Sequence, residues 1–434
     1  MQKKEKPGKT MKLNPEICEQ FTAILRTELK PAMGCTEPIS IAYAAAYARE
    51  LLGCEPEHCE IQCSGNIIKN VNAVTVPQTN GLRGIDVAVL AGAIGGDAKR
   101  ELEVLTAMTD AARARIRELQ QAKIVDVQLL QTDHPLHFIL SMTAKDQSVR
   151  VEIIDAHTNL GEIWHNGKCI HQRGEQISTG SAEPDYSVLN IRDILAYAES
   201  DDLSEAFSIV ENQLRCNAAI SNEGLTNDWG ECVGKTLLQL DPTENGRICA
   251  LAAAGSDARM NGCALPVVIN SGSGNQGLTV SMPVYAHATA LGVSHEKLLR
   301  ALCVSNLVAL RQKRDIGKLS AFCGAVSAAA GAVAGIAYLD GASYEVICDT
   351  VTNTICTIGG MVCDGAKSSC AGKIAAALRC GLLSYQMAQN KRVYRTGEGI
   401  VGEDIETTIS NVGRMAKQGM RSTDTEILNI IIGN

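Results

Sequence analysis

The spacing of apolar residues predicts two regions of different structure along the chain. Between residues 123 and 172, four segments alternate apolar and polar residues and are separated by turn signals: KIVDVQLLQ, HFILSMTA, SVRVEIID and GEIWHNGKCI. This period of two is typical of antiparallel strands with one buried face. After Asp185 the strand pattern mostly stops, and residues 217–434 read mainly as Ala- and Gly-rich helices. We therefore predict an α+β fold, in which an α+β lobe with a small antiparallel sheet precedes a largely α-helical lobe.

The boundary between the lobes is predicted within residues 176–187, QISTGSAEPDYS, a polar stretch typical of a loop. The lobes then cover residues 12–186 and 187–434. In the first lobe, Asn14 and Pro15 are suited to begin a helix over 14–29. A second, Ala-rich helix is expected over 38–52. Residues 60–78 read as a strand, a turn and a strand, and a charged helix is expected over about 99–121.

Composition and charge narrow the class of protein. The chain has 434 residues, of which 45% are apolar and 20% charged, as in soluble globular proteins of two domains. Aromatic residues make up only 3%, which leaves few platforms for base stacking, and the net charge of −8 disfavours a phosphate backbone. We therefore expect no nucleic-acid partner. Small-residue helices pack equally well within and between chains, so a homo-oligomer is left open.

One segment has the length of a membrane span. Residues 321–339, AFCGAVSAAAGAVAGIAYL, carry no charge over 19 positions. Ala, Gly and Ser gain little from lipid, so we expect a buried helix and no membrane partner. The basic start MQKKEKPGKTMKLNPE lacks an apolar run, and the 17 cysteines are scattered through apolar, helix-like stretches. Both features favour a reducing cytoplasm, in which most cysteines are buried thiols.

A glycine-rich loop follows the short apolar run LPVVI. Gly272, Gly274 and Gly277 form the pattern G-x-G-x-x-G. A dinucleotide site would also need a βαβ unit and an acid about 20 residues on. Glu296 has that spacing but lies in a helical pattern, and Pro283 interrupts the expected phosphate-binding helix. The loop's free N–H groups can instead hold a carboxylate. A tight helix–helix connection is an equally good interpretation.

The histidines and several common catalytic motifs give no signal. A Walker A loop, HExxH and a Gly-x-Ser-x-Gly elbow are absent from the sequence, and the eight histidines show no zinc spacing. The histidines of the sheet region are expected at the surface. We therefore look to the cysteines for candidate chemistry.

Three cysteines stand out by their position. Cys323 lies where a polar segment enters an Ala/Gly helix, and Cys363 and Cys370 bracket the polar residues DGAKSS between two apolar helices. Loops and helix N-termini can present thiolates to a metal cluster. Zinc normally takes four protein ligands, and no fourth is evident. Three ordinary buried thiols are the alternative.

A fourth cysteine lies in the turn PAMGCTEP. Cys35 stands between Pro31 and Pro38, next to Gly34 and just before a predicted helix. The field of a helix N-terminus can lower the pKa of a thiol. Cys35 is therefore the best single candidate for a reactive cysteine.

Five motifs in order, PAMGCTEP, SGNIIKN, GSGNQG, LSAFCGA and CDGAKSSC, resemble the L-cysteine desulfidase family, which is related to the iron–sulfur L-serine dehydratases. The resemblance runs from about residue 14 to residue 430. It implies a 4Fe–4S lyase that converts L-cysteine to pyruvate, ammonia and sulfide without pyridoxal phosphate. Carried over by motif, Cys323, Cys363 and Cys370 would hold the cluster and leave one iron open. Cys35 would be the base that removes the α-proton.

The same motifs offer groups to hold a small amino-acid substrate. In SGNIIKN, Lys69 is suited to pair with the carboxylate and Asn70 lies beside it. The loop GSGNQG adds the expected substrate-binding residues Ser273, Gly274 and Asn275. Exposure of Lys69 on a hairpin is the alternative.

Between the two loop cysteines, Asp364 and Lys367 could tune a cluster, although a plain loop ion pair explains them as well. Three other functions stay open. The same chemistry would suit an L-serine dehydratase, the cysteines alone would suit a non-catalytic metal-binding protein, and the glycine loop alone would suit a nucleotide-binding oxidoreductase.

Overall fold

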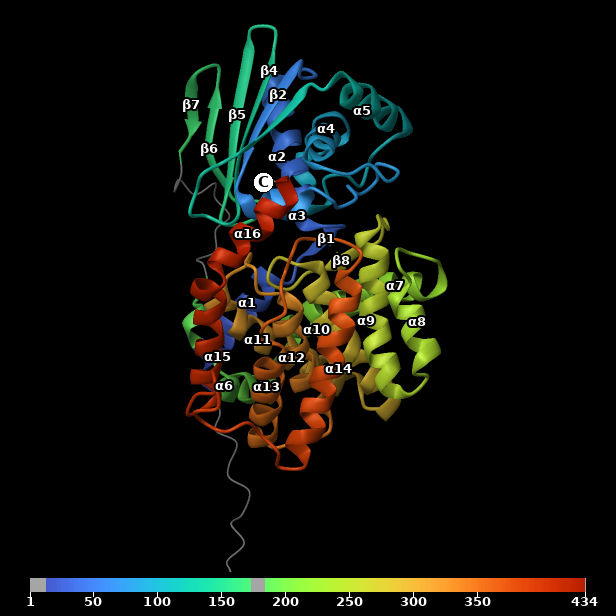
Figure 1. Cartoon of the computed structure of the whole chain (residues 1–434), viewed down its shortest axis with the longest axis vertical. Helices are drawn as coiled ribbons and strands as arrows, with labels where there is room; N and C mark the ends of the chain where they lie inside the picture. Colours follow the sequence, from blue (N-terminus) through green and yellow to red (C-terminus); the bar gives the residue numbers. More distant parts are fainter. Residues whose placement is uncertain (1–12, 173–183, 434) are drawn as a thin grey trace, which may run out of the picture.

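Helices and strands follow one another in the first part of the chain, and helices make up most of the rest. The computed structural model describes residues 13–172 and 184–433, so most of the predicted boundary at 176–187 lies outside the described residues. The predicted α+β class is confirmed (Figure 1). The first helices are α1 (Pro15–Glu28), α2 (Thr36–Leu52), α3 (Gly65–Val71), α4 (Ile85–Gly95) and α5 (Asp110–Ala122), with the 3-10 segment η1 (Ala98–Glu103).

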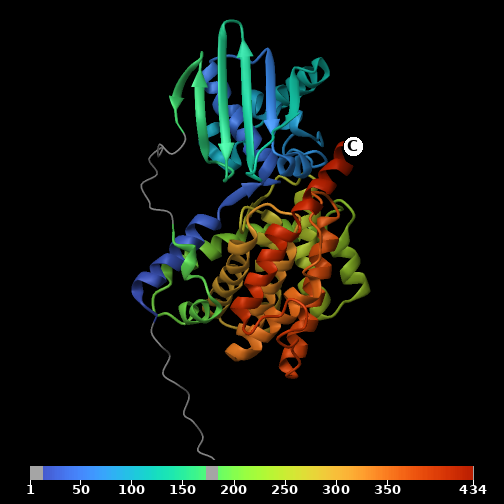
Figure 2. The ribbon, with the colours of Figure 1, turned by 60° about the vertical axis from the view of Figure 1, so that its left-hand side comes forward.

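Six strands form the large sheet of the upper lobe (Figure 2). They are β2 (His58–Cys63), β3 (Val125–Leu129), β4 (His137–Ala144), β5 (Gln147–Ile154), β6 (Leu160–His165) and β7 (Lys168–His171), in the order β3-β2-β4-β5-β6-β7. All neighbours are antiparallel except β2 and β3, which run parallel, so the sheet is mixed. Helices α2 and α4 cover one face (Figure 1).

Two predicted elements differ from the structure. Residues 60–78 were expected to form two strands, but β2 is followed by the helix α3. Ser64 ends the strand and caps this helix, because its side chain accepts the backbone N–H of Ile67. The charged helix begins later than expected, since Thr109 caps α5 through the N–H of Ala112. Short polar side chains at the helix starts therefore set the bounds of both elements, which the spacing of apolar residues had placed differently.

Helices make up the lower body (Figure 1). They are α6 (Ile191–Ala198), α7 (Ser204–Thr226), α8 (Val233–Leu240), α9 (Glu244–Met260), α10 (Gly274–Leu291), α11 (His295–Ile316), α12 (Gly324–Leu339), α13 (Tyr344–Ile358), α14 (Cys370–Gln389) and α15 (Ile405–Arg414). The last helix, α16 (Arg421–Ile432), leaves the body and packs on α3 of the upper lobe (Figure 1). Short helical segments precede α6 (η2, Tyr186–Val188) and α16 (η3, Met415–Gly419).

The uncharged segment 321–339 forms the buried helix α12, as predicted. It packs so closely on α11 that a Cβ at Gly331 would lie 2.4 Å from the carbonyl oxygen of Ser305, which explains the run of small residues. In the part of the chain that the structure describes, no helix combines the length and apolarity that a membrane crossing needs.

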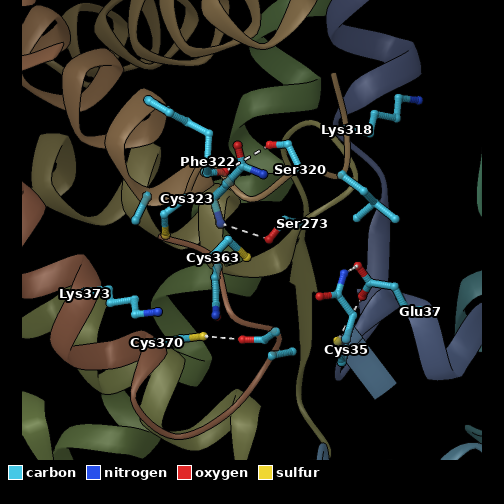
Figure 3. A pocket seen from close by; sticks show the side chains of 18 of the residues that line it. Cys35, Glu37, Ser273, Lys318, Ser320, Phe322, Cys323, Cys363, Cys370 and Lys373 are labelled. Atoms are coloured by element: carbon cyan, nitrogen blue, oxygen red, sulfur yellow. Dashed lines mark hydrogen bonds between the residues drawn. The ribbon is translucent and has the colours of Figure 1, made fainter. Parts of the chain in front are cut away.

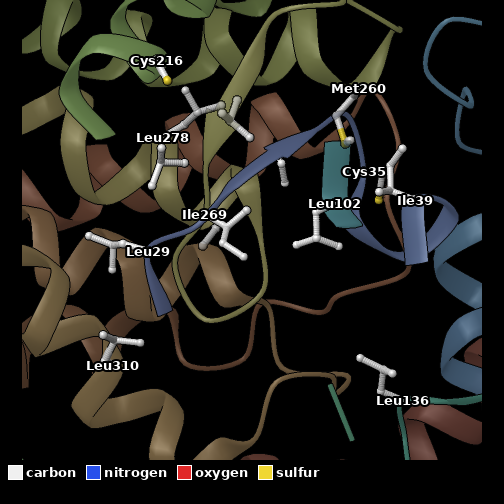
Figure 4. Packing of buried hydrophobic residues seen from close by; sticks show 14 of the residues in the cluster. Leu29, Cys35, Ile39, Leu102, Leu136, Cys216, Met260, Ile269, Leu278 and Leu310 are labelled. Atoms are coloured by element: carbon white, nitrogen blue, oxygen red, sulfur yellow. The ribbon is translucent and has the colours of Figure 1, made fainter. Parts of the chain in front are cut away.

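The two lobes exchange segments. The short strand β1 (Pro31–Met33) pairs antiparallel with β8 (Pro266–Val268) from the helical body. Helix α1 packs on the body, where Thr22 and Tyr197 share a hydrogen bond of 2.7 Å between their hydroxyls. Apolar side chains surround the β1–β8 pair, including Ile39 and Ile269 (Figure 4). This pairing brings the turn that follows β1 next to the glycine loop that follows β8.

Candidate functional site

A cavity of about 100 Å³ lies where the two lobes meet. All four candidate cysteines line it, and they come from segments far apart in the sequence (Figure 3). Cys35 and Glu37 lie at one end, which we call the Cys35 end. Cys323, Cys363 and Cys370 lie at the other, which we call the three-cysteine end.

Backbone hydrogen bonds hold two cysteines of the three-cysteine end side by side. The N–H of Cys323 donates to the carbonyl of Met361 over 3.0 Å, and the N–H of Cys363 donates to the carbonyl of Ala321 over 2.7 Å. Cys323 is the N-cap of α12, and Cys370 is the first residue of α14. The free N–H groups of two helix starts therefore lie near these sulfur atoms, where they favour negative charge.

Lysines surround the three-cysteine end. Lys373 donates to the carbonyl of Val362 over 2.8 Å and forms an ion pair with Asp364, which also pairs with Lys367. Burial raises the pKa of Asp364, but hydrogen bonds from the two lysines outweigh it and lower the pKa to about 2. The loop ion pair considered for Asp364 and Lys367 is thus present, extended by Lys373.

Two of these thiols, Cys323 and Cys370, keep their protons in the free protein because their pKa values are raised. Burial, followed by the proximity of Cys363, raises the pKa of Cys323 to about 12, and burial raises the pKa of Cys370. Lys313 also lines the cavity, and burial lowers the pKa of its ammonium to about 8, although Cys363 and Cys323 oppose that shift. A bound metal reverses this balance, because thiols release their protons when they bind a cation.

The donor set fits an iron–sulfur cluster. Such clusters are held by cysteine thiolates, and this end offers three thiols with Lys313 and Lys373 beside them to offset thiolate charge. Within residues 13–172 and 184–433, no three Cys, His, Asp or Glu side chains are arranged closely enough to hold a single metal ion. A group of four irons is wider than one ion, so its ligands stand farther apart. A mononuclear zinc site is correspondingly disfavoured.

Cys35 has a different surrounding. It is the N-cap of α2, in the turn before a helix as predicted, and its Sγ donates to Oε2 of Glu37 over 3.0 Å. Burial, followed by the charge of Glu37, raises the pKa of the Cys35 thiol well above its ordinary value. The expected lowering of this pKa is therefore wrong for the free protein. The helix field is outweighed by the loss of water and by the adjacent carboxylate.

Glu37 was missed from the sequence. Its Oε2 also accepts from the hydroxyl of Thr36 over 3.1 Å, and its Oε1 accepts from Nδ2 of Asn70 over 3.1 Å. Burial raises the pKa of Glu37, but the charge of His157, the Cys35 hydrogen bond and other groups outweigh it and lower the pKa. The carboxylate therefore stays ionised inside the protein. The available signal was an acid two residues after a candidate cysteine, in the first turn of the same helix.

Arg259 was also missed. Its side chain lines the cavity and is only 3% exposed, and its Nε donates to the carbonyl of Gly34 over 2.9 Å. Within the described residues it forms no ion pair with a carboxylate. A Cβ at Gly274 would lie 2.3 Å from Nε of Arg259, so the glycine leaves room for the guanidinium. The segment DARMNG around Arg259 carries no motif that could have indicated it.

His157 and His137 correct the expectation that the sheet-region histidines lie at the surface. His157 is 6% exposed and His137 is 7% exposed. The carbonyl of His157 accepts from the hydroxyl of Ser40 over 2.5 Å, and a Cβ at Gly272 would lie 2.9 Å from its ring. Burial lowers the pKa of His157, despite the opposing charge of Glu37. A buried histidine behind the glycine loop leaves no periodic signal in sequence.

The predicted substrate-binding residues separate into two groups. Asn70, Ser273 and Asn275 line the cavity. Gly274 does not line the cavity, but its lack of a side chain leaves room for the guanidinium of Arg259. Lys69 is on the helix α3 and not on an exposed hairpin, and its ammonium binds Oδ1 of Asp424 at 2.5 Å, with a side chain 1% exposed. The ammonium of Lys69 is thus paired with Asp424, and Lys69 does not line the cavity.

The glycine loop does not form a nucleotide site of the βαβ type. Among the described residues, β8 pairs only with β1, and that pairing is antiparallel. The helix α10 runs through Pro283 without ending, so the expected interruption is also wrong. A Cβ at Gly277 would lie 2.0 Å from the carbonyl oxygen of Val268. This glycine therefore serves the close helix–strand contact, and the hypothesis of a nucleotide-binding oxidoreductase loses its structural basis.

Comparisons with known proteins indicate the family of the chain. Residues 99–429 match the sequence model of a family described as "Serine dehydratase alpha chain". A "UPF0597 protein" of Lachnoclostridium phytofermentans is 47% identical over 410 residues, 94% of this chain and 98% of the relative. Proteins of the same printed name from Finegoldia magna (45% over 415 residues, 95% and 99% covered) and Treponema denticola (41% over 429 residues, 97% and 100% covered) are similar over equal lengths. The matched family segment contains the three-cysteine end, whereas Cys35 precedes it.

Proposed function

Since this chain belongs to the serine dehydratase alpha-chain family, we propose that it is an iron–sulfur lyase that acts on a small β-substituted L-amino acid. L-Cysteine is the first proposed substrate and L-serine the second. The observation that carries the proposal is that one cavity is lined by three cysteines and by a fourth cysteine, Cys35, which is hydrogen-bonded to the carboxylate of Glu37. The preference for cysteine rests on the resemblance of the five motifs to cysteine desulfidases, because the lining residues themselves suit either leaving group.

Cys323, Cys363 and Cys370 would hold a 4Fe–4S cluster. When bound, such a cluster supplies a Lewis acid for the substrate and its leaving group. The protein's contribution at this end is to place three thiols together through the Cys323–Met361 and Cys363–Ala321 backbone bonds and to balance their charge with lysines.

Cys35 is the proposed base at the opposite end. As a thiolate it would take the α-proton, the electron pair of the Cα–H bond would form the Cα–Cβ double bond, and the Cβ–S bond of cysteine would break to release sulfide. With serine, the Cβ–O bond breaks instead. The aminoacrylate product becomes an imine that water hydrolyses to pyruvate and ammonia. Glu37 already accepts the thiol proton of Cys35 in a 3.0 Å hydrogen bond, so it is placed to keep or receive that proton.

Arg259 is the proposed partner of the substrate carboxylate. Its guanidinium is buried, lines the cavity and lacks a carboxylate of the described chain. A guanidinium binds a carboxylate through two parallel hydrogen bonds. Its charge also opposes the rise in pKa of both Cys35 and Cys370, so it acts on both ends of the cavity. This role was first expected of Lys69, but Asp424 already engages that ammonium.

The test is a side-by-side assay of protein purified and reconstituted without oxygen. We expect a brown protein with about four iron and four sulfide per chain, which releases sulfide from L-cysteine with no added cofactor. Pyruvate formation from L-serine, measured in the same preparation, decides the order of the two substrates. A colourless, iron-free preparation would contradict the lyase. Bound iron without turnover of either amino acid would instead favour a non-catalytic metal-binding protein.

A further inference from the structure

Among residues 13–172 and 184–433, no side chain or backbone group donates a hydrogen bond to three amide oxygens of the cavity. They are Oδ1 of Asn70, Oδ1 of Asn275 and Oε1 of Gln276, and all three residues line the same cavity. Asn70 is 6% and Gln276 5% exposed. A buried acceptor without a donor is costly, so these oxygens need water in the free protein. A ligand that displaces this water must bring its own donors.

The orientation of the Asn70 amide is fixed by its neighbour. Nδ2 of Asn70 donates to the ionised carboxylate of Glu37. A carboxylate only accepts hydrogen bonds, so the amide cannot turn over, and its oxygen must face away from Glu37. Asn275 directs its own Nδ2 to the sulfur of Met260 over 3.4 Å, which leaves its Oδ1 unpaired.

Gln276 approaches from the other end of the cavity. A Cβ at Gly324 would lie 2.6 Å from Cδ of Gln276. Gly324 follows Cys323 directly, so the glycine leaves room for the Gln276 amide beside the three-cysteine end. The three oxygens therefore come from α3 and from the start of α10, and their residues line the one cavity that contains both the Cys35 end and the three-cysteine end.

We infer that Asn70, Asn275 and Gln276 form the site for the protonated α-amino group of the substrate, an inference that rests on the proposed function. A primary ammonium carries three N–H donors and no acceptor, which matches three neutral acceptors. The ionised Glu37 beside Asn70 adds attraction for a cation. Arg259 supplies the opposite charge for the carboxylate. The site therefore selects α-ammonium carboxylates and rejects hydroxy acids and simple carboxylic acids of the same size.

The test compares ligands that cannot react. L-Alanine, (S)-lactate and propanoate have the same carbon chain and no leaving group, and they differ in the α-substituent. Binding to the reconstituted protein is measured without oxygen by titration calorimetry. We expect L-alanine to bind at least about tenfold more tightly than either other ligand, because a hydrogen bond to a charged group is strong when water is excluded.

Two variants of similar size sharpen the test. Gln276→Met removes the acceptor and should weaken L-alanine binding by about tenfold, whereas propanoate binding should not change. Gln276→Glu keeps an acceptor and should preserve or tighten L-alanine binding. Gln213→Met is the control, since Gln213 is buried but bonds to Asn306 within the helical body; it should alter neither affinity. Asn275→Leu repeats the comparison at a half-buried position if Gln276→Met does not fold.

Equal affinities for L-alanine and propanoate, or no detectable L-alanine binding, would overturn the assignment. So would a Gln276→Met variant that weakens both ligands alike, because that result indicates a role in shape only. The outcome is separate from the lyase assay. Selective L-alanine binding without turnover of cysteine or serine would retain the ammonium site and reject the lyase, and turnover with unselective binding would do the reverse.

Discussion

The four cysteines of one cavity lie in two different surroundings. At the Cys35 end, a single thiol donates its proton to Glu37 and has that carboxylate as its nearest charge. At the three-cysteine end, Cys323 has other thiols and Lys373 around it. Burial raises the thiol pKa at both ends. The neighbouring groups differ between the two ends. They decide whether a thiol can pass its proton to a base or release it on binding a metal.

A thiol beside a carboxylate keeps a proton within reach of a second base, which suits proton transfer. Thiols beside lysines and helix N-termini give up their protons when a cation arrives, and the ammonium groups then balance the remaining negative charge. In the proposed function, the same residue type would thus serve acid–base chemistry at one end and metal binding at the other. Substitutions at each end should separate these two roles.

The largest effect is expected at the three-cysteine end. Cys363→Ala should reduce bound iron to background and lower turnover by at least about a thousandfold, because metal-assisted chemistry is lost with the ligand. Iron analysis and the sulfide assay measure both. Cys380→Ala, on α14 but outside the cavity lining, is the matched control and should retain iron. Full iron content in Cys363→Ala would remove this residue from the proposed ligands.

At the Cys35 end the expected effect is on rate alone. Cys35→Ser should lower kcat by about 10²–10⁴-fold, the usual contribution of a positioned base, while the iron content and the colour persist. Cys54→Ser, just beyond the end of α2, should leave the rate unchanged. Loss of iron in Cys35→Ser equal to that in Cys363→Ala would mean that the two ends are not distinct.

Sequence reasoning found the parts of this comparison that depend on local pattern. The helix start at Asn14, the alternation of strands β4–β7 and the position of Cys35 before a helix all follow from short-range chemistry, and the structure agrees. The fold class and the relation to serine dehydratases were likewise predicted correctly. The gathering of the four cysteines in one cavity could only be inferred through the family resemblance, because their segments are far apart in the chain.

The groups that sequence reasoning missed depend on contacts between distant segments. Arg259 reaches the cavity because β1 pairs with β8 and brings Gly34 to its Nε. Glu37 accepts a hydrogen bond from Asn70 on α3, a helix within the segment 60–78 that the sequence pattern had indicated as a strand, a turn and a strand. Lys69 looked like a free cation, yet the C-terminal helix supplies Asp424 as its partner. None of these pairings leaves a period or a motif in one sequence.

That last pair predicts a moderate loss of stability that leaves the three-cysteine end intact. Asp424 accepts from both Lys69 and Asn66 of α3, and the Lys69 side chain is 1% exposed. Asp424→Asn should lower the free energy of unfolding by about 1–3 kcal/mol, because a buried ammonium loses its counter-charge. Urea unfolding measures this. Iron binding should persist, since the cysteines take their backbone bonds from the helical body.

The same helix provides the control for this loss. Arg421 pairs with Asp133, but the two side chains are 74% and 88% exposed, and exposed pairs contribute little. Asp133→Asn should therefore change the free energy of unfolding by less than about 0.5 kcal/mol. Equal losses in Asp424→Asn and Asp133→Asn would show that burial of Lys69 does not matter.

The smallest effect concerns the pH dependence of Cys35 itself. Only the thiolate reacts with iodoacetamide, and a raised pKa moves the onset of that reaction to higher pH. Burial is the largest cause of the raised pKa and persists in Glu37→Gln, but the carboxylate charge, the second cause, is removed. The pKa of Cys35 should therefore fall part of the way back, and the reaction should begin at lower pH. At a fixed pH below the onset, alkylation should be roughly threefold to tenfold faster.

Peptide mass spectrometry of cluster-free protein measures the alkylation of Cys35 directly. Glu152 is a buried carboxylate paired with His137 in the sheet, so Glu152→Gln should leave the pH profile unchanged. An unchanged profile in Glu37→Gln would mean that burial alone holds the proton, and the contrast between the two ends would then lie only in the lysines around the other three thiols.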